Sequence, residues 1–201
     1  MANSASHALG AVLSFVALFA MLRLALEQTV WHMVGVGVFG VSLVLLYSVS
    51  ALYHWSKVPS RKRFLWILDH CLIFVLIAGS YTPWLLVSLR GAWGWSLLVA
   101  VWLIAAVGIV LKTKFLPRFQ LLGVFLYVAM GWLVCVALGP LREAVNQEGM
   151  KWLVTGGVFY TSGVVFYLLH RLPFNHLVWH LFVMAGSLCH VIAVVKGVLA
   201  A

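Results

Sequence analysis

Apolar runs of about twenty residues, each long enough to cross a bilayer as a helix, follow one another along almost the whole chain. Hydrophobic residues make up 65% of the 201 positions and charged residues only 8%, and the mean hydropathy is +1.10. A soluble globular domain carries about a quarter charged residues. The composition therefore excludes an ordinary water-soluble globule and predicts a polytopic membrane protein.

The expected fold is an all-α integral membrane protein, a seven-transmembrane-helix bundle that forms one domain over residues 1–201. The connections are short, and the sequence shows no soluble domain, linker or internal repeat. Three cysteines fall inside apolar runs without CxxC spacing, so neither a disulfide framework nor a thiolate metal site is indicated. The seven expected spans lie near residues 8–26, 31–54, 64–89, 92–111, 119–138, 152–169 and 176–197.

The distribution of basic residues predicts a cytoplasmic N-terminus. Cytoplasmic connections of membrane proteins are enriched in Lys and Arg, which also explains the formal net charge of +9 without nucleic acid. With seven spans, the side of the N-terminus carries more basic residues than the other side, and the cluster over residues 57–63 strengthens the bias. The two sets are Lys57, Arg61, Lys62, Arg63, Lys112, Lys114, Arg118 and Arg171 against Arg23, Arg90, Arg142, Lys151 and Lys196.

Histidines in and beside these spans are the main candidates for a functional site. His176 and His180 are four residues apart, which places them one turn apart on the same face of the last span. His54 closes the second span and Asp69 opens the third, with Ser50 one turn before His54. In the expected topology all five residues lie at similar depth near the cytoplasmic side. An ionisable residue in hydrocarbon is costly, so this agreement in depth indicates a functional site.

Three imidazoles with an open fourth position form a known catalytic zinc arrangement. We expect His54, His176 and His180 as the zinc ligands, and zinc held in this way lowers the pKa of a bound water to about 7. Asp69 would then act as general base, and Ser50 would hold the water, a substrate carbonyl or a ligand. The alternative is a purely structural role, in which such histidines only form hydrogen bonds between helices. An HxxxH without an internal Glu is a weak motif by itself, so the prediction depends on the whole constellation.

The remaining histidines are weaker candidates. His190 follows His176 by fourteen residues, which is about 21 Å along a helix and too far to share a metal. His70 is expected to point about 100° away from Asp69. His7, near the start of the first span, lies at the end of the bundle from which it could approach the site.

Several motifs occur in order along essentially the whole chain and point to a known family. They are Asn3-Ser4-Ala5-Ser6-His7, Ser50-Ala51-Leu52-Tyr53-His54, Leu68-Asp69-His70, Ala78-Gly79-Ser80-Tyr81-Thr82-Pro83, His176-Leu177-Val178-Trp179-His180 and Ala185-Gly186-Ser187-Leu188-Cys189-His190. In these motifs the sequence resembles the haemolysin III proteins, the bacterial branch of the progestin and adipoQ receptor family. The family's N-terminal segment often has an acidic residue before the Asn, and this sequence shows none.

The resemblance implies seven transmembrane helices with a cytoplasmic N-terminus, in the cytoplasmic (inner) membrane of a bacterium. It also implies zinc held near the cytoplasmic side by His54, His176 and His180, with Asp69 and Ser50 as the water-holding acid and serine. Eukaryotic receptors of the family are linked to ceramidase-type amide hydrolysis. Bacterial members carry a haemolysin label and are connected with membrane-lipid homeostasis.

Two classes of function remain open on the sequence. One is a zinc-dependent hydrolase acting on an amide or ester bond of a membrane lipid with a long acyl chain. The other is a non-enzymatic membrane-state sensor, receptor-like protein or haemolysin in which zinc is structural. An ion transporter is a third class, disfavoured because charged residues are otherwise missing from the spans. The sequence does not identify the metal, because His-rich sites accept several divalent ions, nor does it give the oligomeric state.

Overall fold

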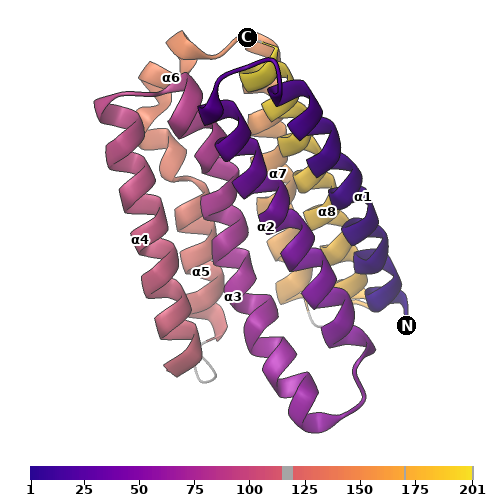
Figure 1. The fold of residues 1–201 in the computed structure, drawn as a ribbon. Coiled ribbons are helices and arrows are strands. Elements are labelled where there is room, and N and C mark those ends of the chain that lie inside the picture. The colour runs from indigo at the N-terminus through magenta and orange to yellow at the C-terminus, as the bar shows by residue number, and fades with distance from the viewer. Residues whose placement is uncertain (115–119, 170, 201) are drawn as a thin grey trace.

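The computed structural model describes residues 1–114, 120–169 and 171–200, and the regular elements there are all helices, running side by side with the two termini at opposite ends of the bundle (Figure 1). Arg118 and the expected start of the fifth span at residue 119 lie outside the described residues. The elements are α1 (Ala2–Ala25), α2 (Val30–Trp55), α3 (Pro59–Pro83), η1 (Trp84–Ser88), α4 (Ala92–Lys114), α5 (Gln120–Gly131), η2 (Leu133–Ala137), α6 (Leu138–Ala144), α7 (Gln147–Leu168), α8 (Asn175–Val194) and η3 (Val195–Leu199).

Six helical stretches within the described ranges are long and apolar enough to cross a membrane, as an integral membrane protein requires. The fifth of them, Leu121–Ala144, joins α5, η2 and α6, so one expected span is a helix with an internal irregularity. α7 has 22 residues but is not among the six. Its first turns contain Gln147, Glu148 and Lys151, and four glycines dilute its apolar character further.

The outer surface of α1 shows how the bundle is adapted to lipid. Phe15, Val16 and Phe19 are more than half exposed, whereas the buried residues of α1 include Ser4, His7, Gly10 and Ser14. A soluble helix would bury the large apolar side chains. Helices in lipid gain nothing from hiding such chains from the bilayer and instead pack through small residues that let backbones approach closely.

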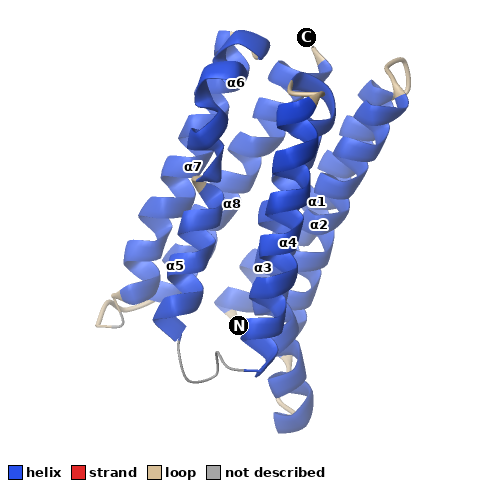
Figure 2. Ribbon diagram, turned by 90° about the vertical axis from the view of Figure 1, so that its left-hand side faces the viewer, coloured by secondary structure: helices blue, strands red, loops and turns tan. Residues whose placement is uncertain are grey.

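Neighbouring helices pack in pairs that place α8 between α1 and α7, while α2 packs on α1 and α3 (Figures 1 and 2). Glycines allow two of these close approaches. A Cβ at Gly10 of α1 would lie 2.7 Å from the Tyr47 ring of α2, and one at Gly163 of α7 would lie 3.0 Å from the Trp179 ring of α8. The first contact sets α1 against α2, and the second sets α7 against the part of α8 that carries the histidines.

The beginning of α8 is set by an unusual backbone conformation. Phe174, which precedes the helix, has φ 57° and ψ 18°, and it is the one non-glycine residue with positive φ in the described part of the chain. A bulky residue in the left-handed region is uncommon and strained. This turn starts α8 abruptly, so His176 lies in its first turn.

Lys112 departs from its expected place. The sequence puts it in the connection after the fourth span, but α4 continues to Lys114 and buries Lys112 inside the bundle, with 2% of the residue exposed. It is therefore not a loop charge. Lys112 no longer counts among the basic loop residues whose distribution predicts a cytoplasmic N-terminus.

Candidate metal centre

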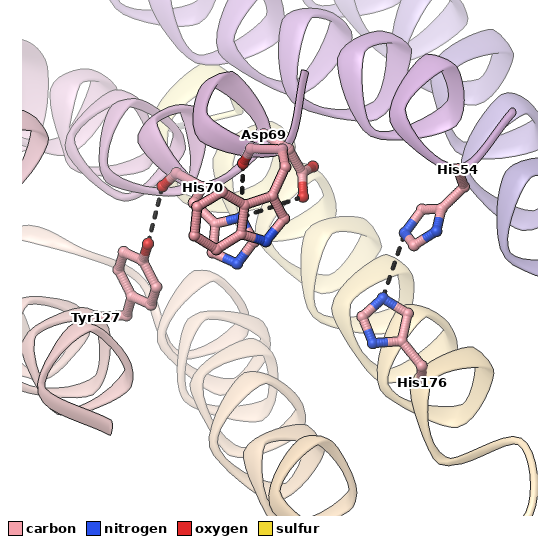
Figure 3. A network of polar contacts seen from close by, with 6 residues as sticks. His54, Asp69, His70, Tyr127 and His176 are labelled. Atoms are coloured by element: carbon pink, nitrogen blue, oxygen red, sulfur yellow. Dashed lines mark hydrogen bonds and ion pairs between the residues drawn. The ribbon is translucent and has the colours of Figure 1, made fainter. Parts of the chain in front are cut away.

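The three histidines expected to bind zinc meet at the end of the bundle where the N-terminus lies. His54 comes from the last turn of α2, and His176 and His180 come from the first two turns of α8. One ring nitrogen from each histidine lies within 4.8 Å of the corresponding nitrogens of the other two. Among the described residues, these three form the group that could hold a metal ion. His54 Nε2 lies 3.3 Å from His176 Nε2, and Figure 3 shows the two rings facing each other.

One pair of ring nitrogens has the separation expected around a tetrahedral metal. Nitrogens bound at about 2.0–2.1 Å to one tetrahedral zinc ion lie about 3.3 Å apart, the separation found between the His54 and His176 nitrogens. The ring centroids form a near-equilateral triangle, with 5.0 Å between His54 and His176, 4.9 Å between His54 and His180, and 4.6 Å between His176 and His180. Imidazole suits zinc, copper, iron and nickel, so the donor set does not determine the metal.

A hydrogen-bond chain from α1 fixes the tautomer of His180. The Ser6 hydroxyl donates its single proton to the Asn3 carbonyl at 3.0 Å, and Ser6 Oγ lies 3.0 Å from His180 Nδ1. Because the hydroxyl proton is already used, Nδ1–H of His180 must donate to Ser6 Oγ. The Nε2 lone pair of His180 is then free for a metal, as in many metal sites whose second ring nitrogen is held by an outer partner.

His7 covers the other face of His180. The two rings are stacked, with centroids 3.5 Å apart and planes 14° from parallel, and the edge of Tyr47 meets His7 at 5.0 Å. His180 is 1% exposed as a result. Neither ring nitrogen of His7 has a hydrogen-bond partner within the described residues. His7 thus approaches the site from α1, and it does so by packing.

Ser6 was not singled out by the sequence reasoning. The signal was present, because residues three and four apart lie on one helix face, and Asn3, Ser6 and His7 have that spacing in a stretch already noted for its resemblance. The sequence alone does not show that the beginning of α1 packs against the start of α8.

Asp69 and Ser50 lie together beside the histidines. Both are buried, with 9% and 2% exposed, and the Ser50 side chain is within hydrogen-bonding reach of the Asp69 carboxyl. Asp69 is not in the three-histidine cluster but lines the same cavity as His176 and His180. The arrangement places a carboxyl and a hydroxyl next to the candidate metal centre.

His70 lies nearer to Asp69 than its helical position suggested. Its Nδ1 is 3.7 Å from Asp69 Oδ2, which is too long for a hydrogen bond. The same nitrogen instead hydrogen-bonds the Trp66 carbonyl of its own helix at 2.8 Å. Tyr127 of α5 donates to the His70 carbonyl at 2.9 Å and joins this cluster to the far side of the bundle (Figure 3).

A cavity of about 600 Å³ extends from the histidines along the inside of the bundle. Its polar lining includes Ser50, Asp69, His176 and His180 near the N-terminal end, and Arg142 and His190 further along the bundle. Leucines are prominent in its far part, namely Leu85, Leu89, Leu97, Leu138 and Leu141.

His190 lines the same cavity but takes no part in the metal cluster. Its ring lies 5.3 Å from the Tyr160 ring, and neither ring nitrogen has a hydrogen-bond partner within the described residues.

Comparisons with known proteins agree on the family. Residues 1–191 match the family model described as haemolysin-III related. The chain is 44% identical over 188 residues to Hemolysin-3 of Bacillus cereus, covering 93% of this chain and 86% of that protein. It is 44% identical over 188 residues to the Hemolysin-3 homolog of Bacillus subtilis (strain 168), covering 93% and 88%. It is also 29% identical over 179 residues to the human monocyte to macrophage differentiation factor, covering 85% of this chain and 73% of that protein.

Proposed function

We propose, from the premise that the chain belongs to the haemolysin-III-related family, that it is a zinc-dependent membrane hydrolase. Its substrate would be a membrane lipid with a long acyl chain joined through an amide or ester bond, as in a ceramidase, and its role would be membrane-lipid homeostasis. The observation that carries the proposal is the meeting of His54, His176 and His180 beside a long apolar cavity that Asp69 and Ser50 also line.

Each polar residue receives a role in this proposal. His54, His176 and His180 hold the metal, and the bound metal would polarise the scissile carbonyl and favour a water nucleophile. Asp69 lies outside the ligand set and would accept the proton of the attacking water as general base. Ser50 is within hydrogen-bonding reach of Asp69 and would orient that carboxyl toward the water.

The cavity supports an acyl-chain substrate. Its volume of about 600 Å³ lies within the range of about 300–1,000 Å³ found for small-molecule sites. A lipid whose carbonyl lies at the histidines would direct its chain toward the leucines of the far part. Excluding water there would strengthen the electrostatic interactions at the reacting end.

The topology that goes with this function has seven spans, with α7 as the span that composition alone does not identify. α7 packs along α8 over its length (Figure 1), so it should share its depth. We further propose that the N-terminus and the histidines face the cytoplasm, in the cytoplasmic membrane of a bacterium.

The test is release of fatty acid by the detergent-purified protein. The zinc-loaded protein is incubated with a panel of ceramides and glycerolipids, and free fatty acid is measured by mass spectrometry beside a His176→Ala variant and a chelator-treated sample. Release that needs both His176 and the metal supports the proposal. A protein with full zinc occupancy that cleaves no member of the panel would refute the hydrolase.

A second candidate, structural zinc in a membrane-state sensor or haemolysin, is favoured by one observation. The cluster joins α2 to α8, two helices that are not among the closely packed pairs of the bundle. A metal there would fasten them together. In that case zinc removal should lower the melting temperature sharply, while the zinc-loaded protein releases no fatty acid.

A further inference from the structure

Lys112 is a buried cation that the proposed mechanism does not use. It lies in the last turn of α4, and only 2% of the residue is exposed. A lysine near the end of a membrane helix normally extends its ammonium group toward the headgroups. Lys114, two residues later on the same helix, is exposed. Lys112 instead lines the cavity.

The surroundings of Lys112 do not neutralise it. Nζ lies 5.0 Å from the centroid of the Trp66 ring, a distance at which the ring face attracts a cation. Asp69 is near enough to interact with its charge. However, no carboxylate in the described part of the chain approaches Lys112 Nζ within 4.0 Å. A buried charge is costly unless it is paired and hydrogen-bonded.

The position of Lys112 relates it to any lipid in the cavity. It lines the cavity together with Asp69 and Trp66, at the end that holds the histidines, and the far lining contains many leucines as well as Arg142. Arg142, the other Lys or Arg side chain named in the lining, comes from α6, whose end of the bundle lies opposite the N-terminus (Figure 1). A lipid with its acyl chain among the far leucines would therefore have its polar end beside Lys112.

We propose that the cavity takes acyl lipids that carry an anionic oxygen group, and that Lys112 binds this group. The inference rests on the proposed function only in that an acyl lipid occupies the cavity. The further claim is that the polar group of the bound lipid is negatively charged. A neutral ceramide should therefore bind more weakly than an anionic lipid of equal chain length. The anionic group can be the phosphate of a phospholipid or the carboxylate of a fatty acid.

The experiment measures binding selectivity without requiring turnover. Detergent-purified protein is offered an equimolar mixture of dioleoyl phosphatidylglycerol and dioleoyl phosphatidylcholine, and bound lipid is counted by native mass spectrometry. A second mixture pairs oleate with oleyl alcohol, so that the two mixtures distinguish phosphate from carboxylate. The variants are Lys112→Gln and Lys112→Arg, with Lys114→Gln as the matched control on the same helix.

The wild type should prefer the anionic member of at least one mixture. Because the ammonium group would donate a charge-assisted hydrogen bond to the anionic oxygen, Lys112→Gln should reduce that preference about ten-fold or more. Lys112→Arg and Lys114→Gln should keep it. The inference is overturned if the wild type shows no preference in either mixture, if Lys112→Gln retains it, or if Lys114→Gln loses it equally.

Repeating the binding assay with His180→Ala separates this inference from the hydrolase. Selectivity that survives in a variant unable to cleave lipid supports the binding role of Lys112 even if no turnover is ever found. Efficient cleavage of neutral ceramide, with no preference for anionic lipids, would overturn the inference and leave the hydrolase in place.

Discussion

Two regions of α8 carry histidines inside the bundle, and they differ in what surrounds the imidazoles. At the start of the helix, His176 and His180 meet His54, and His180 is also hydrogen-bonded to Ser6. Further along the same helix, His190 has two buried ring nitrogens without a hydrogen-bond partner in the described residues. Histidines in the first region are thus part of a candidate metal centre, whereas the histidine in the second region has no hydrogen-bond partner among the described residues.

The difference comes from the neighbouring helices. Around His180, the beginning of α1 and the end of α2 bring polar side chains to the same depth. Around His190, α7 presents Gly156, where a Cβ would lie 2.4 Å from the imidazole Cδ2. That glycine gives room for the ring but no hydrogen-bonding group. A histidine inside this bundle therefore joins the candidate metal centre only where other helices supply polar partners at the same depth.

The largest expected effect is loss of the metal from the first region. His180→Ala should reduce metal content from about one ion per chain to background, because two imidazoles alone do not complete a stable site. His190→Ala should retain the metal. Elemental analysis of both variants beside the wild type measures this, and equal losses in the two variants would show that the two regions do not differ as described.

The second effect separates the ligands from the acid beside them. Asp69→Asn should keep the metal but lower fatty-acid release by about 10²–10⁴-fold, the usual contribution of a general base. The measurement is release per metal ion bound. If Asp69→Asn loses the metal together with activity, Asp69 belongs to the ligand set and the separation into ligands and base is wrong.

Much of this region could be predicted from the sequence because its residues have helical spacing. The four-residue step from His176 to His180 fixes one face, and the positions of His54 and Asp69 at span ends give a common depth. The structure places the three histidine nitrogens together, while the roles of Asp69 and Ser50 stay predictions.

Other features were not predictable because they depend on which helices touch. The Ser6 contact requires α1 to cross the start of α8, and the burial of Lys112 requires α4 to continue past its apolar run and turn that residue inward. Neither follows from hydropathy. The contact of His70 with Asp69 likewise depends on side-chain rotamers that a helical wheel does not give.

A smaller effect tests the outer partner of His180. Ser6→Ala removes the acceptor of the His180 Nδ1–H and should weaken metal affinity by about 10–100-fold. Ser14→Ala is the matched control, because Ser14 lies on the same helix and its hydroxyl donates to the Gly10 carbonyl at 2.7 Å. Competition with a zinc chelator measures both. Equal affinities for Ser6→Ala and the wild type would mean that packing by His7 alone orients His180.

The smallest effect concerns the isolated ring. Because an unpartnered buried polar group costs about 1–3 kcal/mol and an apolar replacement of similar shape removes that cost, His190→Leu should raise the free energy of unfolding by about 1 kcal/mol. His190→Gln, which keeps buried polar atoms, should give no such gain. Thermal unfolding in detergent measures both variants, with metal content as a check that the first region is unchanged. A destabilised His190→Leu would show that the ring nitrogens have a partner of their own, and the contrast between the two regions of α8 would then lie in the kind of partner.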